Sequence, residues 1–192
     1  LAALGATQAS AYLLILEPGT PFGAHPPVVP DEDATVELYM TAMEGLETAG
    51  YRQYEISNAA QSGKESRHNL KYWNSNPYLG VGPAASSYLG CKRFHYPRNT
   101  AAFLAGAEPE EETDEVIPTG SAEEYALLRL RLTAGLTETG FAARFGDAIP
   151  AAWRRRAAAL PGTLVTADAA GIRLSRQGFL VSNTLIGHIL AG

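Results

Sequence analysis

The sequence contains one cysteine, Cys91, among 192 residues, and this scarcity excludes several kinds of site. A single thiol cannot form a disulfide within the chain, and it cannot supply the ligands of an all-thiolate metal centre. An iron–sulfur cluster held by three or four cysteines therefore cannot assemble on this chain alone.

Long hydrophobic runs and a basic leader are also missing. No stretch approaches the roughly 20 consecutive apolar residues that a membrane-spanning helix needs. Residues 1–5 carry no positive charge of the kind that opens a secretory signal, and the chain does not begin with methionine. We expect a cytoplasmic protein without a membrane span, and we expect this chain to be an excised piece of a longer polypeptide.

The composition is that of a globular protein, with 46% hydrophobic and 18% charged residues. Its net charge of −5 argues against non-specific nucleic-acid binding by the whole chain. The charge is unevenly distributed, because residues 1–120 carry 7 basic and 15 acidic side chains whereas residues 121–192 carry 8 and 5. This asymmetry predicts two domains.

The first part of the chain has the pattern of an α/β layer. An apolar run at 9–16 predicts a strand buried on both faces. Acidic residues at 31–33 precede apolar residues at helical spacing up to Gly50, which predicts a helix over this stretch. A second strand is expected at 51–56, so that strand, helix and strand form a parallel βαβ unit.

The sequence from residue 108 onward predicts a connector followed by a second domain. Six acids lie among residues 108–115, as expected for a solvated linker. Beyond it, three helices, a hairpin around residues 168–171 and a last helix at about 176–190 predict a winged-helix-like module. We therefore divide the chain into 1–107, an acidic linker at 108–119, and a mostly helical domain at 120–192.

Among chemistry-bearing residues, His68 is the strongest candidate. Its imidazole has Tyr72 and Trp73 nearby and could ligate haem iron, although an isolated histidine in a loop is more often only hydrogen-bonded. A helical segment would place Tyr72 on the face of His68, and an extended one would also keep Tyr72 on that side with Trp73 pointing away. His95 is the secondary candidate.

Three weaker signals have competing interpretations. Glu55, at the end of an expected strand, either points toward a ligand crevice or lies on an exposed edge, and the sequence does not decide between them. The glycines Gly80 and Gly82 form a GxG pattern that, without context, indicates a tight turn. The arginines at 154–156 could grip nucleic acid, but they are more typical of a solvated helix face.

Several segments together resemble the oxygen-independent coproporphyrinogen III oxidase family of radical S-adenosylmethionine (SAM) proteins. The resemblance covers essentially the whole chain, and the HNxxYW pattern at 68–73 is similar to the HemW, or haem-chaperone, branch. It rests on Tyr12-Leu-Leu-Ile-Leu-Glu-Pro-Gly-Thr20, Gly50-Tyr-Arg-Gln-Tyr-Glu-Ile-Ser-Asn58, Arg67-His-Asn-Leu-Lys-Tyr-Trp73, Tyr78-Leu-Gly-Val-Gly-Pro83, Arg144-Phe-Gly146, Leu174-Ser-Arg-Gln-Gly178 and Val181-Ser-Asn183.

The resemblance implies the last β/α elements of a partial TIM (radical SAM) barrel followed by a winged-helix-like domain. It also implies a CxxxCxxC segment, a [4Fe–4S] cluster and SAM in a full-length protein. That cysteine motif is absent here, so the chain alone is expected to be inactive in radical chemistry. One departure is Ser86, where the family usually has a histidine.

The resemblance also suggests site residues and partners. His68 is expected to ligate the haem iron, and the other residues expected to contact haem are Asn69, Tyr72 and Trp73. The candidates for lining the pocket are Glu17, Tyr54, Glu55, Ser57, Asn58, Gly80 and Gly82. The expected partners are haem or porphyrin and haem-requiring acceptor proteins, without nucleic acid; transient association with a membrane is compatible with the resemblance.

Two functions remain open at this point. One is haem binding and delivery, with His68 as iron ligand. The other is the accessory part of an oxygen-independent coproporphyrinogen III oxidase, which converts coproporphyrinogen III to protoporphyrinogen IX by oxidative decarboxylation. In that second case residues 51–90 close the substrate pocket and ligate nothing.

Overall fold

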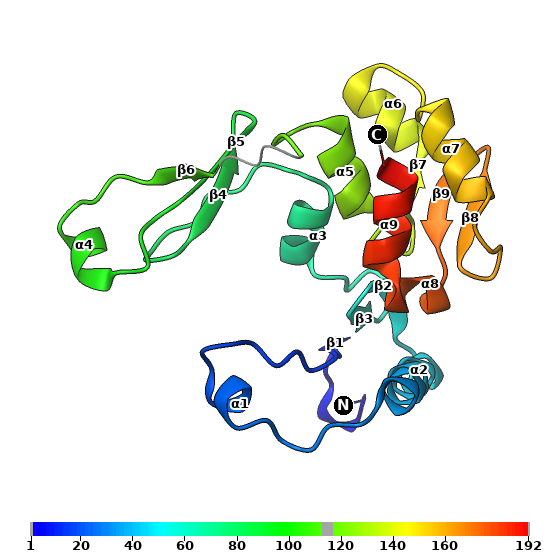
Figure 1. Ribbon diagram of the computed structural model, residues 1–192, viewed down its shortest axis with the longest axis horizontal. Helices are drawn as coiled ribbons and strands as arrows, with labels where there is room; N and C mark the ends of the chain where they lie inside the picture. Colours follow the sequence, from blue (N-terminus) through cyan, green and yellow to red (C-terminus); the bar gives the residue numbers. More distant parts are fainter. Residues whose placement is uncertain (1, 113–116, 192) are drawn as a thin grey trace. The chain divides into compact units, whose positions relative to one another are not determined.

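The computed structural model describes residues 2–112 and 117–191, and it is a mixed α/β structure (Figure 1). Its contacts group the chain into two compact units, one up to Ser66 and one from Arg67 onward. The predicted α/β class is confirmed, and the described residues contain three separate three-stranded sheets and no closed barrel.

The first unit holds one small sheet and one long helix. A 3₁₀ turn (Ala2–Leu4) precedes β1 (Gln8–Ser10) and the short α1 (Pro21–Ala24), and then come α2 (Glu32–Thr48), β2 (Arg52–Glu55) and β3 (Asn58–Ala60). The predicted helix is confirmed as α2. The Asp31 side chain accepts a hydrogen bond from the Ala34 amide at 2.8 Å at its start, and Gly50 follows its end with a φ of +88°.

Two predictions for this unit are wrong. The strand expected at 9–16 ends at Ser10, and the side chains of residues 12–15 are exposed. The expected parallel pairing is replaced by an antiparallel sheet of order β1-β3-β2. The chain turns back directly after β2, so β3 pairs with β2 locally and, through its other edge, with β1. Both outer strands do run in the same direction, but β3 separates them.

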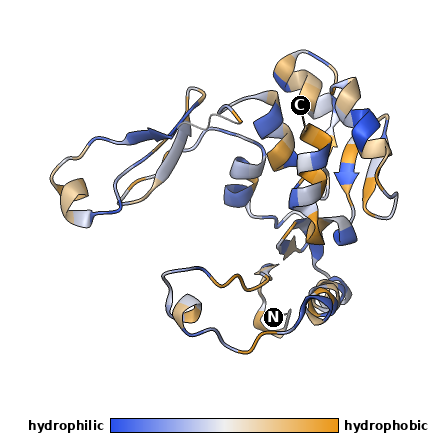
Figure 2. Cartoon of the chain, viewed as in Figure 1, coloured by the Kyte–Doolittle hydropathy of each residue, from blue (hydrophilic) through white to orange (hydrophobic). Residues whose placement is uncertain are grey.

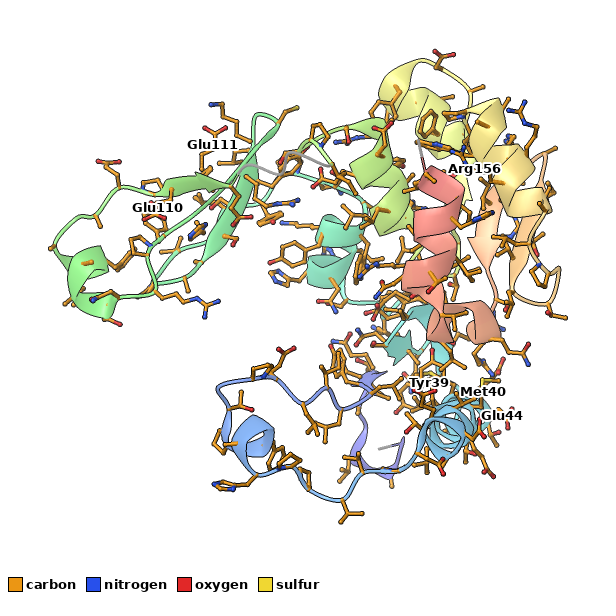
Figure 3. All side chains as sticks on the ribbon, in the orientation of Figure 1. Tyr39, Met40, Glu44, Glu110, Glu111 and Arg156 are labelled. Carbon is orange, nitrogen blue, oxygen red and sulfur yellow. The ribbon has the colours of Figure 1, made fainter. Side chains whose placement is uncertain are left out.

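The second unit opens with α3 (Arg67–Trp73) and a sheet of order β4-β5-β6. Its strands are β4 (Ser86–Leu89), β5 (Lys92–His95) and β6 (Glu110–Glu112), with α4 (Thr100–Leu104) between β5 and β6. Glu110 and Glu111, labelled in Figure 3, belong to β6.

The prediction of a solvated acidic linker is therefore wrong for residues 110–112. Antiparallel pairing places these acids beside basic strand neighbours: Glu111 lies 2.9 Å from Lys92 Nζ, and Glu112 lies 3.2 Å from His95 Nδ1. Opposite charges across a strand pair stabilise it modestly, which explains why a strand forms here. Residues 113–116 of the expected linker lie outside the described residues.

The winged-helix-like part is confirmed in its order of elements. It comprises α5 (Ala122–Arg129), β7 (Leu136–Thr137), α6 (Glu138–Phe145), α7 (Ala151–Ala158), β8 (Val165–Asp168), β9 (Gly171–Leu174), α8 (Arg176–Leu180) and α9 (Ser182–Leu190). The sheet order is β7-β9-β8, and the expected last helix is divided into two at Val181.

A continuous apolar core holds these helices and strands together. Figure 2 shows hydrophobic residues along β8, β9 and α9. Large members with at most 5% of their surface exposed are Leu130, Leu136, Phe141, Trp153, Val165, Ile172, Leu174, Phe179, Leu185, Ile186 and Ile189. Burial of this many large side chains is the main stabilising contribution to this part of the chain.

The compact units do not coincide with the predicted segments. Residues 67–107 group with the helical module instead of with residues 1–66. Helix α3 contacts α5, and side-chain hydrogen bonds over long sequence separations also join the two parts, from Arg129 to Asn74 and from Arg144 to Ser75. The domain scheme of 1–107, 108–119 and 120–192 thus stays a prediction, and the packing places a boundary at Ser66.

Candidate functional site

The candidate site is built on α3, a short helix that ends in a defined cap. The Asn76 amide donates to the Lys71 carbonyl at 2.8 Å and the Ser75 amide to the Tyr72 carbonyl at 2.9 Å. Ser75 has the left-handed φ of +51° that this pattern requires, and it is buried. The cap fixes where the helix ends. The exposed side chains of His68 and Tyr72 therefore project from a helix with a defined end.

His68 and Tyr72 form a contacting pair on that face. Their spacing of four residues places them one turn apart, and Tyr72 Oη lies 2.9 Å from His68 Nε2. The two rings are edge-to-face, with centroids 4.9 Å apart. Both side chains are exposed. The helical alternative for this segment is therefore the one that the structure has.

Two further tyrosines extend this pair into a row. The Tyr72 and Tyr78 rings are 4.5 Å apart and edge-to-face, and Tyr78 and Tyr88 are 6.3 Å apart. Tyr78 and Tyr88 also exchange backbone hydrogen bonds of 2.9 Å, so the loop and β4 hold their rings in register. We call His68, Tyr72, Tyr78 and Tyr88 the aromatic row.

Burial raises the pKa of the Tyr78 hydroxyl, and the nearby Arg93 guanidinium offsets part of this effect. The Tyr78 phenol is therefore neutral at physiological pH, and it adds an aromatic ring and a hydroxyl group without negative charge to the surface beside Tyr72. Such a surface can contact a flat apolar molecule through ring faces and edges.

The other two candidates on α3 lie differently. Asn69 and Trp73 are half-buried, and Trp73 is five residues beyond His68, which takes it off the face of the aromatic row. The structure thus brings His68 and Tyr72 together and leaves Trp73 apart from them.

Gly80 and Gly82 are explained by the geometry of their turn. The Gly80 amide donates to Ser87 Oγ at 3.0 Å, and a Cβ at Gly80 would lie 2.3 Å from the Ser86 carbonyl oxygen. Gly82 has a φ of +117°, which side chains disfavour. Both glycines let the loop pack closely against β4, and this close packing accounts for the GxG pattern.

The remaining pocket candidates lie in the first unit, where Glu55 and Asn58 contact each other. Glu55 is 1% exposed; the Asn58 amide donates to its carboxylate, and Ser10 donates in turn to Asn58. Burial raises the pKa of Glu55, while the hydrogen bonds from Asn58 and from backbone amides lower it by less. Glu55 is therefore neither a crevice carboxylate nor an exposed edge acid, but a buried hydrogen-bonded one.

Of the other first-unit candidates, Ser57 contacts this pair, because its backbone amide donates a hydrogen bond to the Glu55 carboxylate. Tyr54 Oη accepts a hydrogen bond from the Ser66 amide at 3.3 Å, and the Ser57 carbonyl accepts one from Ala11 at 2.8 Å. Glu17 is exposed, and its carbonyl accepts from the Thr20 hydroxyl at 2.7 Å.

His95, the secondary candidate, lies close to two glutamate carboxylates. His95 Nδ1 lies 3.2 Å from Glu112 and its Nε2 lies 3.9 Å from Glu110. Its ring nitrogens are therefore less accessible to an iron atom than those of His68, whose contact is with a neutral phenol.

The arginines of α7 are likewise engaged within the fold. Arg154 binds Glu138 and the Asp168 carbonyl, and Arg156 donates from Nε to the Ile189 carbonyl at 2.9 Å. These contacts agree with the interpretation of 154–156 as a structural helix face and leave only Arg155 fully on the outside.

The residues present do not suit a resident metal cluster. Within 2–112 and 117–191 there is no group of three or more His, Cys, Asp or Glu side chains arranged for a metal ion. Cys91 is exposed and unpaired. An iron–sulfur cluster needs more thiolates than this chain has. In the same described ranges, no helix is both long enough and apolar enough to cross a membrane.

Comparison with known proteins places these features in context. No family model matches the chain. It is 33% identical over 203 residues to "Heme chaperone HemW" of Bacillus subtilis, covering 97% of this chain and 52% of that protein. With Escherichia coli "Heme chaperone HemW" the identity is 34% over 143 residues, covering 70% of this chain and 37% of HemW.

The fold has a relative among solved structures. Coproporphyrinogen III oxidase (HemN) from Escherichia coli, described as a radical SAM enzyme, matches with a TM-score of 0.66 over 99% of this chain and 49% of HemN, at 13% identity. The chain thus spans about half the length of each of these relatives except E. coli HemW, of which it matches 37%. The predicted resemblance is confirmed: this is a chain with a HemW-like sequence and a HemN-family fold.

Proposed function

We propose, on the premise of this HemW-like sequence and HemN-family fold, that α3 carries a haem-binding site and that His68 ligates the iron. Haem is the cargo of this site, passed on to haem-requiring acceptor proteins. The observation that carries the proposal is the aromatic row, in which the exposed rings of His68 and Tyr72 contact each other, the half-buried Tyr78 continues them, and the buried Tyr88 supports Tyr78.

The contact between Tyr72 and His68 controls the availability of the imidazole. Iron needs an unprotonated ring nitrogen. If His68 Nε2–H donates to Tyr72 Oη, the lone pair lies on Nδ1; if Tyr72 donates, it occupies the Nε2 lone pair and must swing away before iron binds there. The phenol therefore selects the tautomer of His68: it leaves Nδ1 free in the first case and blocks the single lone pair in the second.

A haem titration followed by the Soret band tests the proposal. We expect His68→Ala to abolish the shifted Soret band of the complex and His95→Ala to leave it in place. His95→Ala is the matched control, because it removes an imidazole of the same unit that lies between carboxylates. Loss of the band only in His95→Ala would move the ligand to His95.

Tyr72→Phe refines the assignment. Removing the hydroxyl frees Nε2 while the ring stays in the row. Tighter haem binding by this variant is expected if the phenol must leave before ligation, and unchanged binding is expected if iron takes Nδ1. Because both results require His68, the same titration with the double variant Tyr72→Phe/His68→Ala should show no ligated haem.

The other candidates have supporting parts in this proposal. Asn69 and Trp73 are expected to contact the edge of the macrocycle, and Gly80 and Gly82 to shape the loop beneath it. The first-unit candidates Glu17, Tyr54 and Ser57 are expected to line a pocket of the longer protein, which the buried pair of Glu55 and Asn58 supports from within the fold. The [4Fe–4S] cluster and SAM implied for full-length relatives are expected to bind residues outside this chain.

The fold match to HemN supports one alternative function. The chain would then be the accessory part of a coproporphyrinogen III oxidase, and its aromatic row would close a substrate pocket without ligating iron. Haem binding that is indifferent to both His68→Ala and His95→Ala would favour this alternative.

A further inference from the structure

A cation stands at the end of the aromatic row farthest from His68. Arg144, on the last turn of α6, donates from Nη2 to Tyr88 Oη and to Ser75 Oγ, both at 3.4 Å. Its guanidinium carbon also lies over the rings of Tyr125 and Phe145, 5.3 and 5.9 Å from their centroids. These contacts give the guanidinium a fixed direction, because a planar cation stacks on aromatic faces.

Arg144 differs from the other arginines near the aromatic row because it is exposed and forms no ion pair within the described residues. Arg93 is paired with Glu124 at 2.8 Å, and Arg129 is largely desolvated and bound to Asn74 and the Gly135 carbonyl. Arg144 is exposed, and no carboxylate of the described residues forms an ion pair with it. It is therefore a pre-oriented cation that an external carboxylate can reach.

The cap of α3 connects the His68 end of the aromatic row to Arg144. His68 and Trp73 are five residues apart within α3, about 7.5 Å along its axis at 1.5 Å per residue, and Ser75 follows in the cap. Arg144 contacts Ser75 directly. Tyr72 is exposed and Tyr78 is half-buried between these two ends, so their rings can contact a macrocycle, whereas Tyr88 is buried beside Tyr78.

We propose that Arg144 binds a propionate of the haem whose iron is held by His68, so that the aromatic row receives the macrocycle between a metal ligand and a carboxylate anchor. This inference rests on the proposed function and deepens it, since it makes the site selective for tetrapyrroles that carry free carboxylates. Guanidinium pairs with carboxylate through two parallel hydrogen bonds, which adds orientation as well as affinity.

The test compares haem with its dimethyl ester, in which both propionates are blocked and the iron is unchanged. Each is titrated into the 192-residue chain at one fixed detergent concentration, with the Soret band as readout. The variants are Arg144→Gln, which keeps a polar side chain, and Lys71→Gln, which removes an exposed positive charge from α3. The parent is expected to bind haem about tenfold more tightly than the ester, the strength of one charge-assisted hydrogen bond.

Arg144→Gln is expected to weaken haem binding by about tenfold and to leave ester binding unchanged, so the preference of the parent disappears. Lys71→Gln should stay within about threefold of the parent, as expected for an exposed charge. Equal weakening of haem and ester by Arg144→Gln would overturn the proposal, because it would show that Arg144 only supports the row.

Further controls separate this proposal from the function on which it rests. Loss of ligated haem in His68→Ala together with full haem affinity in Arg144→Gln would refute the carboxylate anchor and leave the haem site intact. No ligated haem in the parent would refute the proposed function itself. If Arg144→Gln does not fold, equal affinity of the parent for haem and its ester is sufficient to overturn the proposal.

Discussion

Replacing Gly80 by alanine should destabilise the second unit, because the loop that carries Tyr78 has no room for a side chain. The added Cβ would lie 2.3 Å from the Ser86 carbonyl oxygen and 3.0 Å from the Ala85 Cβ, and the nearer atom belongs to the backbone. The loop must shift by about 1 Å to restore van der Waals contact, and such overpacking costs about 1–3 kcal/mol.

The same shift breaks a second interaction. The Gly80 amide donates to Ser87 Oγ at 3.0 Å, and Ser87 is 0% exposed. A buried hydroxyl left without its partner costs about 1–3 kcal/mol. The two effects sum to about 2–6 kcal/mol of unfolding free energy.

The matched control is Gly187→Ala, on α9 of the same unit. A Cβ there meets nothing within 4 Å, so the substitution should stabilise the helix by about 0.5–1 kcal/mol. Urea denaturation followed by tryptophan fluorescence measures both, since Trp73 and Trp153, the two tryptophans of the chain, lie in this unit. The reasoning is refuted if Gly80→Ala is as stable as Gly187→Ala.

Three more predictions follow from buried and charged groups. Because burial raises the pKa of Glu55, the folded state favours its protonated form. The unfolding free energy should therefore fall as pH rises above the ordinary glutamate pKa of 4.5, and Glu55→Gln should remove that fall in urea titrations followed by circular dichroism. Anaerobic reconstitution should yield no stoichiometric iron–sulfur cluster on the monomer, because Cys91 is the only thiol; iron and sulfide assays measure this. The winged-helix-like module should not bind DNA tightly, because its net charge of +3 (8 basic minus 5 acidic side chains) is small; sequence-selective binding in a gel shift at physiological salt would contradict this.

Local signals in the sequence were sufficient for α2, α5, α6 and α7, whereas α1 and α4 were not expected, α3 was left open, and α8 and α9 were expected as one helix. Asp31 and Gly50 mark the ends of α2, and Gly146 ends α6 with a left-handed φ of +74°. In each case the decisive interaction is made within one turn of the residue concerned, so the sequence window contains it. The order of elements in the winged-helix-like module could be predicted for the same reason.

Pairing between strands required information that the sequence window does not contain. The run at 9–16 is apolar enough for a buried strand, but which edge it meets depends on β3, whose residues 58–60 lie about 50 positions later. β6 was missed because its three glutamates read as a solvated stretch, whereas their partners on β5 provide the opposite charge. Long-range partners decide both cases, as is usual for β structure.

In the candidate site, too, contacts within one helix could be predicted from the sequence, whereas contacts between distant segments could not. The pair of His68 and Tyr72 follows from a spacing of four residues once the segment is helical. Tyr78 and Tyr88 join them only because the loop folds back on β4, and Arg144 arrives from 56 residues beyond Tyr88. No periodicity of the sequence signals that contact.

The central claim is that His68 ligates haem iron on the exposed face of α3. A Soret titration of the 192-residue chain with haem, parent against His68→Ala, tests it most directly. The account predicts a saturable shift of the Soret band in the parent that is lost in His68→Ala and retained in His95→Ala. An unchanged shift and affinity in His68→Ala would contradict it.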